Sequence, residues 1–205
     1  MAESLPDPWW HDGAAPVHPV AQPVKHEMTK NLLLTGNPGC GKTTLIRRVV
    51  ARLGCPIGGF YTEEIREGST RLGFKVITFD GHEGILAHVG VDSPLRVGKY
   101  GVDLKALETV GVASVRHALS ETALVVIDEI GPMELFSQAF CQVVLDALDS
   151  ECVVFGSIVK RSKPFSDQIK TRPDVTVIEV YRGNRDMLVD RVVAVLLATG
   201  RCGPS

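Results

Sequence analysis

The sequence of 205 residues lacks the features that mark nucleic-acid-binding, membrane-spanning and zinc-binding proteins. Lysine and arginine number 22 against 24 aspartates and glutamates, so the net charge of -2 supplies no basic surface for nucleic acid. No apolar run approaches the roughly 18 residues that span a bilayer. The five cysteines include no C-x-x-C pair, which argues against a structural zinc site.

The beginning of the chain also lacks the apolar core of a secretory signal and the many basic residues of a transit peptide. We therefore expect a cytoplasmic protein that acts as a monomer, without a membrane or nucleic-acid partner. Because thiols stay reduced in that compartment, all the cysteines are predicted to be free. They stand at positions 40, 55, 141, 152 and 202.

The length of the chain suits one domain of ordinary size. Prolines punctuate its first 28 residues, which show no helical or strand period. We therefore predict a disordered tail over 1–28 and a folded domain over 29–205. The tail contains Trp9 and Trp10, which we interpret as an exposed pair without a function; docking to a protein partner is the alternative.

A glycine-rich stretch follows a short apolar run and precedes a helical pattern. It matches G-x-x-x-x-G-K-[ST], the phosphate-binding loop. In such a loop, glycines let successive N–H groups point at one phosphate, the lysine reaches the β- and γ-phosphates, and the hydroxyl of Thr43 ligates Mg²⁺. The following helix N-terminus adds partial positive charge. The predicted nucleotide-binding residues here are Gly36, Asn37, Pro38, Gly39, Cys40, Gly41, Lys42, Thr43 and Thr44.

A pair of carboxylates ends the continuous apolar run 123–127, which is typical of a strand buried on both faces. Asp128 fits the Walker B position, where it would hold Mg²⁺ opposite Thr43. Glu129 is predicted to polarise the water that attacks the γ-phosphate. The alternative is a surface or helix-capping acidic pair, but the pair together with a phosphate loop favours hydrolysis.

Candidate residues of a nucleotide site also follow two later strands. Ser157 ends the strand after Walker B, where it would sense the γ-phosphate or be a simple buried serine. Arg161 lies in the basic loop that begins at Lys160 and is our candidate for neutralising charge in the transition state; a solvated basic face is the alternative. Asn184 and Arg185 follow the last strand, where they would contact the nucleobase; an Asn-capped turn is the alternative.

Apolar runs and helical patterns alternate along the chain, which predicts an α/β fold of three layers with a mainly parallel sheet and an inserted β-meander. Right-handed crossovers would bring the carboxyl ends of the strands, with their candidate residues, to one edge. The predicted strands are 31–35, 57–65, 73–79, 84–89, 123–129, 152–158 and 175–180. The predicted helices are 42–53, 103–109, 112–119, 136–148, 165–170 and 185–197, with a loop over 92–101.

Several blocks of this sequence resemble the cancer-related nucleoside-triphosphatase family, which is also known from hyperthermophilic microbes. The resemblance covers about 30–197 and implies a RecA-like P-loop fold. It also implies slow, Mg²⁺-dependent hydrolysis of ATP, GTP, CTP and UTP to the diphosphate. The blocks that carry it are 36–45, Gly59-Phe60-Tyr61-Thr62-Glu63-Glu64, Gly73-Phe74, 96–100, Asp128-Glu129-Ile130-Gly131-Pro132-Met133-Glu134-Leu135-Phe136-Ser137 and Asn184-Arg185.

Two alternatives to a hydrolase stay open from the sequence. In the first, the chain is a nucleotide or nucleoside kinase whose basic segment 160–172 forms a lid. In the second, it is a non-catalytic regulatory module that binds nucleotide and signals to a protein partner through its tail.

Overall fold

The computed structural model describes residues 29–204. Its strands form one nine-stranded sheet in the order β5-β6-β4-β3-β2-β7-β8-β1-β9. The strands are β1 (Asn31–Thr35), β2 (Ile57–Glu67), β3 (Thr70–Thr78), β4 (Glu83–His88), β5 (Arg96–Val97), β6 (Tyr100–Val102), β7 (Leu124–Ile130), β8 (Val153–Ile158) and β9 (Val175–Glu179). The predicted tail and its two tryptophans lie outside the described residues.

The parallel half of the sheet contains the strands that carry the candidate residues. β8 lies between β7 and β1, and all three run parallel. Leu34 of β1 pairs with Ser157 of β8, and Gly156 of β8 pairs with Ile127 of β7. The ends of β7 and β8, with Asp128 and Ser157, therefore lie next to the start of the phosphate loop. β8 thus lies between β1, which leads into the phosphate loop, and β7, which ends in the Walker B carboxylates. This is the RecA-like strand order, which agrees with the fold that the resemblance implied.

The inserted meander is present and is longer than predicted. β2 pairs with β7 in parallel and with β3 in antiparallel orientation, and β4 and β6 continue the antiparallel half. The prediction of a loop over 92–101 is wrong, because β5 and β6 form a hairpin there, in which Val97 pairs with Tyr100. Gly98 has a φ of 59°, as the first central position of a type II′ hairpin turn requires.

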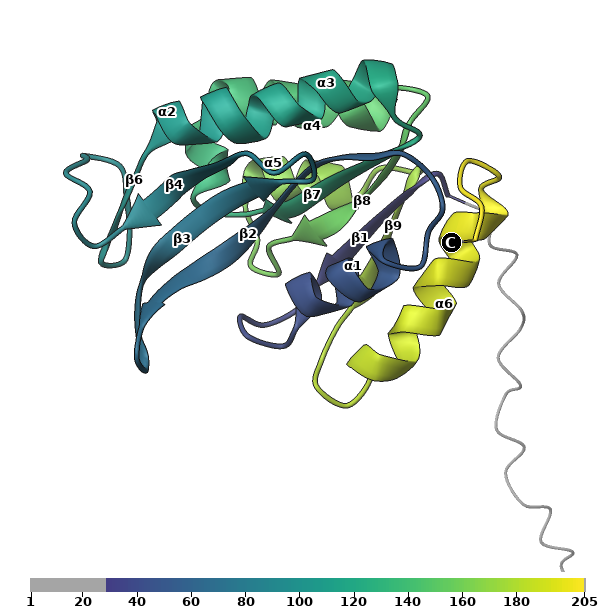
Figure 1. Cartoon of the computed structure of the whole chain (residues 1–205), viewed down its shortest axis with the longest axis horizontal. Helices are drawn as coiled ribbons and strands as arrows, with labels where there is room; N and C mark the ends of the chain where they lie inside the picture. Colours follow the sequence, from purple (N-terminus) through teal and green to yellow (C-terminus); the bar gives the residue numbers. More distant parts are fainter. Residues whose placement is uncertain (1–28, 205) are drawn as a thin grey trace, which may run out of the picture.

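Helices cover both faces of the sheet and confirm the three-layer prediction (Figure 1). The apolar core on one face includes Leu45 and Ile46 of α1 and Val192 of α6. The core on the opposite face includes Val115 of α3 and Val143 of α4. The helices are α1 (Lys42–Val50), α2 (Leu104–Ala106), α3 (Ala113–Glu121), α4 (Gln138–Asp149), α5 (Pro164–Lys170) and α6 (Arg185–Ala198).

Two helical segments differ from their predicted bounds. A π-helical segment, η1 (Leu107–Val112), joins α2 to α3, so the two predicted helices are one continuous stretch. Gly111 explains the predicted break, since glycine weakens a helix interior, but here it is buried against Leu107 and Phe60. A short 3₁₀ helix, η2 (Glu134–Phe136), precedes α4. None of the helices in residues 29–204 is long and apolar enough to cross a membrane.

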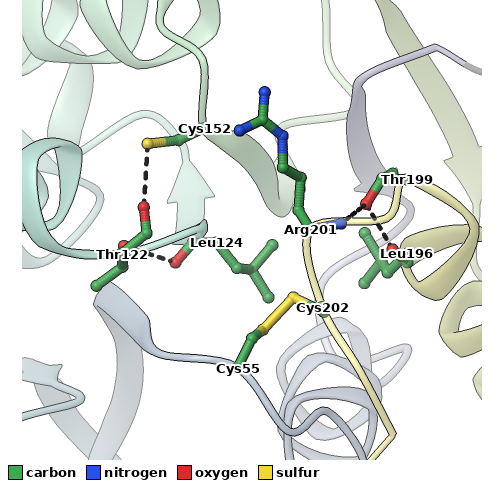
Figure 2. Close-up of a disulfide and its surroundings, with 8 residues drawn as sticks. All are labelled: Cys55, Thr122, Leu124, Cys152, Leu196, Thr199, Arg201 and Cys202. Atoms are coloured by element: carbon green, nitrogen blue, oxygen red, sulfur yellow. Dashed lines mark hydrogen bonds between the residues drawn. A yellow bond between two sulfur atoms is a disulfide. The ribbon is translucent and has the colours of Figure 1, made fainter.

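The prediction that every cysteine is free is wrong. Cys55 and Cys202 form a disulfide across 147 residues of sequence, whereas Cys40, Cys141 and Cys152 are free. Figure 2 shows the bond between the segment that follows α1 and the segment that follows α6. Composition could not reveal this pair, because only the packing of α1 against α6 brings the two segments together.

Candidate active site

The phosphate loop connects β1 to α1 with backbone geometry that only glycine tolerates easily. Gly39 and Gly41 have φ values of 74° and 100°. At Gly36 a Cβ atom would lie 2.3 Å from the carbonyl oxygen of Val180, so the absence of a side chain allows the loop to start against β9. Asn37, Pro38 and Gly39 are exposed at the crest of the loop, and Thr44 is exposed at the start of α1, while Cys40 is buried beneath them.

Lys42 lies at the centre of the site and contacts both the loop and the end of β7. Its Nζ atom is 3.4 Å from the carbonyl oxygen of Gly36 and 3.3 Å from Oε2 of Glu129. The lysine side chain is 10% exposed and the glutamate side chain 29% exposed. The structure therefore brings together the predicted phosphate ligand and the predicted general base, and leaves the base accessible to water.

Asp128 is buried beside this ion pair, next to the β8 strand end. One of its oxygens, Oδ1, accepts a hydrogen bond from the hydroxyl of Ser157, which is fully buried. Burial raises the pKa of Asp128 to about 6, despite the opposing hydrogen bond from Ser157. Neither alternative considered for Ser157, a sensor of the γ-phosphate or a simple buried serine, included this hydrogen bond to Asp128.

The environment of Asp128 fits a divalent cation. Within residues 29–204, Oδ2 of Asp128 is the buried side-chain oxygen that has no hydrogen-bond partner. A buried polar atom without a partner costs free energy, which a cation or its bound water removes. The described residues contain no cluster of three acidic, histidine or cysteine side chains for a metal. Mg²⁺ needs no such cluster, because it is usually held by one or two protein oxygens, water and substrate phosphates.

Glu134 is a third carboxyl group at this site, and sequence reasoning assigned it no role. It is 3% exposed in η2. A Cβ atom on Gly131 would lie 2.6 Å from Oε1 of Glu129 and 2.9 Å from Oε2 of Glu134, so both side chains close over this glycine. Burial, together with the charge of Glu129, raises the pKa of Glu134 to about 8. The only signal for Glu134 in the sequence was a third acidic residue soon after Asp128 and Glu129. Its burial depends on the turn at Gly131, which the sequence did not reveal.

The basic segment 160–172 divides into paired and unpaired cations. Lys160 pairs with Glu179, Lys170 with Asp167, and Arg172 with Asp174 and Asp149. Arg161 and Lys163 form no ion pair with any residue that the structure describes. Arg161 is exposed and lines a pocket with residues that follow β7, instead of contacting the phosphate loop.

The residues that follow β9 contact the opposite side of the phosphate loop. A Cβ atom on Gly41 would lie 2.6 Å from Cδ of Arg185, so this arginine packs directly on the loop. Asn184 does not cap α6 with its side chain. Its amide instead braces the turn, donating to the carbonyl of Glu179 and accepting from the N–H of Tyr181, both at 2.9 Å.

Comparison with known proteins agrees with this geometry. A family model described as NTPase matches residues 31–193. The nucleoside-triphosphatase THEP1 of Thermotoga maritima is 52% identical over 165 residues, which cover 80% of this chain and 94% of the relative. The cancer-related nucleoside-triphosphatase of Homo sapiens is 41% identical over 182 residues, 81% of this chain and 96% of the relative. The crystal structure of THEP1 from Aquifex aeolicus matches with a TM-score of 0.75 at 34% identity, covering 81% of this chain and 98% of that one.

Proposed function

The chain belongs to the NTPase family and hydrolyses nucleoside triphosphates, and we propose that Glu129 is the general base of this reaction. The observation that carries the proposal is the 3.3 Å contact between Glu129 and Lys42, because the phosphate-loop lysine marks the position of the γ-phosphate. When a triphosphate replaces this contact at Lys42, the Glu129 carboxylate is next to the terminal phosphate and accessible to water. It then accepts a proton from the water that attacks phosphorus, and the products are the diphosphate and inorganic phosphate.

The remaining residues of the loop hold the phosphates. The backbone N–H groups of 36–44, apart from Pro38, which has none, and the Lys42 ammonium bind the β- and γ-phosphate oxygens. Thr43 and Asp128 would hold Mg²⁺, with Ser157 orienting Asp128. The cation, when bound, neutralises charge that develops on the phosphate oxygens. The partnerless oxygen of Asp128 supports this assignment.

We propose that base specificity is broad and that turnover is slow. Arg185 and Asn184, which follow β9, are the residues that would contact the nucleoside. Arg185 packs on the loop through its aliphatic stem, and a guanidinium plane stacks on any base. Arg161 as a charge-neutralising residue stays a proposal, because it would have to turn from its pocket toward the γ-phosphate.

We also propose that the enzyme works as a monomer in the cytoplasm. Every residue in the proposed mechanism comes from one chain, and nucleoside triphosphates with Mg²⁺ are the small-molecule partners that this compartment supplies. The kinase and regulatory-module alternatives are less favoured, because a carboxylate placed to activate water suits hydrolysis, and because the relatives are named as triphosphatases.

The test is phosphate release from ATP, GTP, CTP and UTP with Mg²⁺. We expect all four to be hydrolysed slowly. Lys42→Ala and Glu129→Gln should each lower kcat/KM by about 10²-fold or more, the size of a typical general-base contribution. Glu129→Gln should still bind nucleotide, because the substitution keeps the shape of the side chain.

The matched control is Glu151→Gln, the same chemical change at a side chain that is 93% exposed. Its activity should equal that of the wild type. Full activity in Glu129→Gln would refute the role of Glu129. Phosphate transfer that occurs only when an acceptor is added would instead identify a kinase.

A further inference from the structure

A pocket of about 600 Å³ opens beside the proposed active site, and Arg161 is the one lining residue that has a role in the mechanism above. One wall follows β7, a second follows β8, and a third comes from the β5–β6 hairpin of the inserted meander. Sites of about 300–1,000 Å³ are typical for small-molecule ligands. Residues that line the pocket include Arg96, Pro132, Phe136, Arg161, Lys163 and Phe165.

The charge of this pocket is positive and is not neutralised by the protein. In the part of the chain that the structure describes, Arg161 and Lys163 form no ion pair, although three other cations of the same segment do. The guanidinium of Arg96 donates to the carbonyl of Lys99, a neutral acceptor. The three side chains are exposed, so an anion can reach them.

The rest of the lining is apolar and includes aromatic rings. Phe136 is a large apolar side chain that is 39% exposed. Phe165 and Leu135, which also line the pocket, are partly buried and pack against the hydrophobic core. The core packing therefore holds these two side chains in place. A ligand with a flat apolar body would cover Phe136 and remove its exposed surface from water.

The pocket adjoins the position proposed for the γ-phosphate. Pro132 follows Gly131, against which the carboxylates of Glu129 and Glu134 pack. Val159, which also lines the pocket, donates its N–H to the carbonyl of Ile130. The preceding carbonyl, of Ile158, accepts from the hydroxyl of Thr35 at the start of the phosphate loop. Arg185, which would contact the nucleoside, lies on the β9 side of the loop and therefore leaves this pocket free.

We propose that this pocket binds a second ligand, a small organic anion with a carboxylate or phosphate group and an aromatic body. Lys163 and the two arginines bind the anionic group, and Phe136 and Phe165 contact the ring. The ligand occupies the site next to the nucleotide, on the side of the terminal phosphate.

The test is a fluorine NMR titration of the full chain with para-fluorobenzoate, para-fluorophenyl phosphate and the neutral para-fluorobenzamide. Wild type and Lys42→Ala are both titrated, because Lys42→Ala weakens anion binding at the phosphate loop and leaves the pocket intact. We expect saturable binding of an anion to both proteins and much weaker binding of the amide. If only para-fluorophenyl phosphate binds, the ligand class is the organic phosphates. If para-fluorobenzoate binds as well, the ligand class also includes carboxylates.

Substitutions then locate the binding. Lys163→Glu should weaken anion binding about tenfold or more, as expected for loss of a charged hydrogen-bond donor and its replacement by a like charge. Phe136→Ala should weaken binding by removing the ring contact. Lys105→Glu, a charge reversal at an exposed position of α2 outside the pocket lining, should not change it. The proposal fails if no anion binds saturably, if the amide binds as well, if binding disappears in Lys42→Ala, or if Lys163→Glu and Phe136→Ala leave it unchanged. None of these outcomes depends on hydrolysis.

Discussion

Three neighbouring carboxyl groups differ in their surroundings, and their proposed roles follow from that difference. Glu129 is partly exposed and paired with Lys42. Asp128 is buried with one oxygen bound by Ser157 and the other free of partners. Glu134 is buried near both carboxylates, and its raised pKa means that it holds a proton at neutral pH. A protonated Glu134 limits the negative charge beside Glu129, which leaves the base and the Lys42 ammonium to set the local field.

The pH dependence of stability tests the state of Glu134. Between about pH 6 and 8 the native chain retains a proton on Glu134 that the unfolded chain has released. The free energy of unfolding therefore falls as pH rises through this range. In Glu134→Gln this slope should be smaller by up to about 1.4 kcal/mol per pH unit, as for the loss of one titrating proton.

Denaturant titrations at several pH values measure the slope. Asp128 also lowers the free energy of unfolding as pH rises, but mainly below pH 6, because burial raises its pKa only to about 6. Glu151→Gln, on the exposed surface, should keep the wild-type slope. An unchanged slope in Glu134→Gln would mean that Glu134 is ionised in the native protein.

At the scale of elements, the phosphate loop depends on contacts with β9 and α6 as well as on its own glycines. The N–H of Val180 donates to the carbonyl of Thr35 at 2.7 Å, which fixes the entry to the loop. Arg185, the first residue of α6, covers Gly41 at the exit. The contact between α1 and α6 thus aligns two sides of the nucleotide site.

Gly41→Ala tests the contact between loop and helix. The new methyl group would lie 2.6 Å from Cδ of Arg185 at a φ of 100°, so Arg185 must move and the loop is strained. We expect nucleotide affinity to fall about tenfold, in line with roughly 1–3 kcal/mol for strained backbone of this kind. Binding of a fluorescent ATP analogue measures the change.

Gly39→Ala is the matched control, since its φ is also positive, at 74°, but nothing lies within 4 Å of the added atom. It should reduce affinity less than Gly41→Ala. In an Arg185→Ala background the two glycine variants should become more alike. A difference of the original size in that background would show that Arg185 is not involved.

At the scale of the whole molecule, the C-terminal end of the described chain is joined to the segment that follows α1, away from the active site. Cys202 bonds to Cys55 (Figure 2). The N–H of Gly54 also donates to the carbonyl of Gly203 at 2.8 Å. Cys55 precedes β2, so the bond lies near the amino ends of the parallel strands. Asp128 and Ser157 lie at their carboxyl ends, so the disulfide contributes to stability and takes no part in the chemistry.

Cys202→Ser should lower the free energy of unfolding by about 2–4 kcal/mol without reductant, because the bond closes a long loop and restricts the unfolded chain. Hydrolysis at moderate temperature should be unchanged. Thermal unfolding with and without reductant measures the effect, and reductant should destabilise only proteins that retain both cysteines.

Cys141→Ser is the matched control, because Cys141 is a free, partly buried thiol. Its unfolding should remain sensitive to reductant. Equal stability of Cys202→Ser and wild type under oxidising conditions would show that the bond does not form in solution.

Local patterns determined much of the fold and the first set of site residues. The spacing of Gly36, Lys42 and Thr43 identifies a phosphate loop, because its chemistry needs those residue types within one turn. The buried run before Asp128 predicts a strand end, and parallel strands bring such ends to one edge. The predicted strands and helices agree with the structure to within about three residues at their ends, apart from the β5–β6 hairpin, the continuous α2–η1–α3 stretch and the separate 3₁₀ helix η2.

Contacts between distant segments were decided only by the tertiary structure. The bond between Cys55 and Cys202, the packing of Arg185 on Gly41, and the pocket between the β5–β6 hairpin and the ends of β7 and β8 each join residues far apart in sequence. Glu134 is close to Asp128 in sequence, but its burial and raised pKa depend on neighbours packed around the Gly131 turn. Sequence periodicity records which face of an element is apolar, whereas a partner across the molecule depends on how all the elements pack.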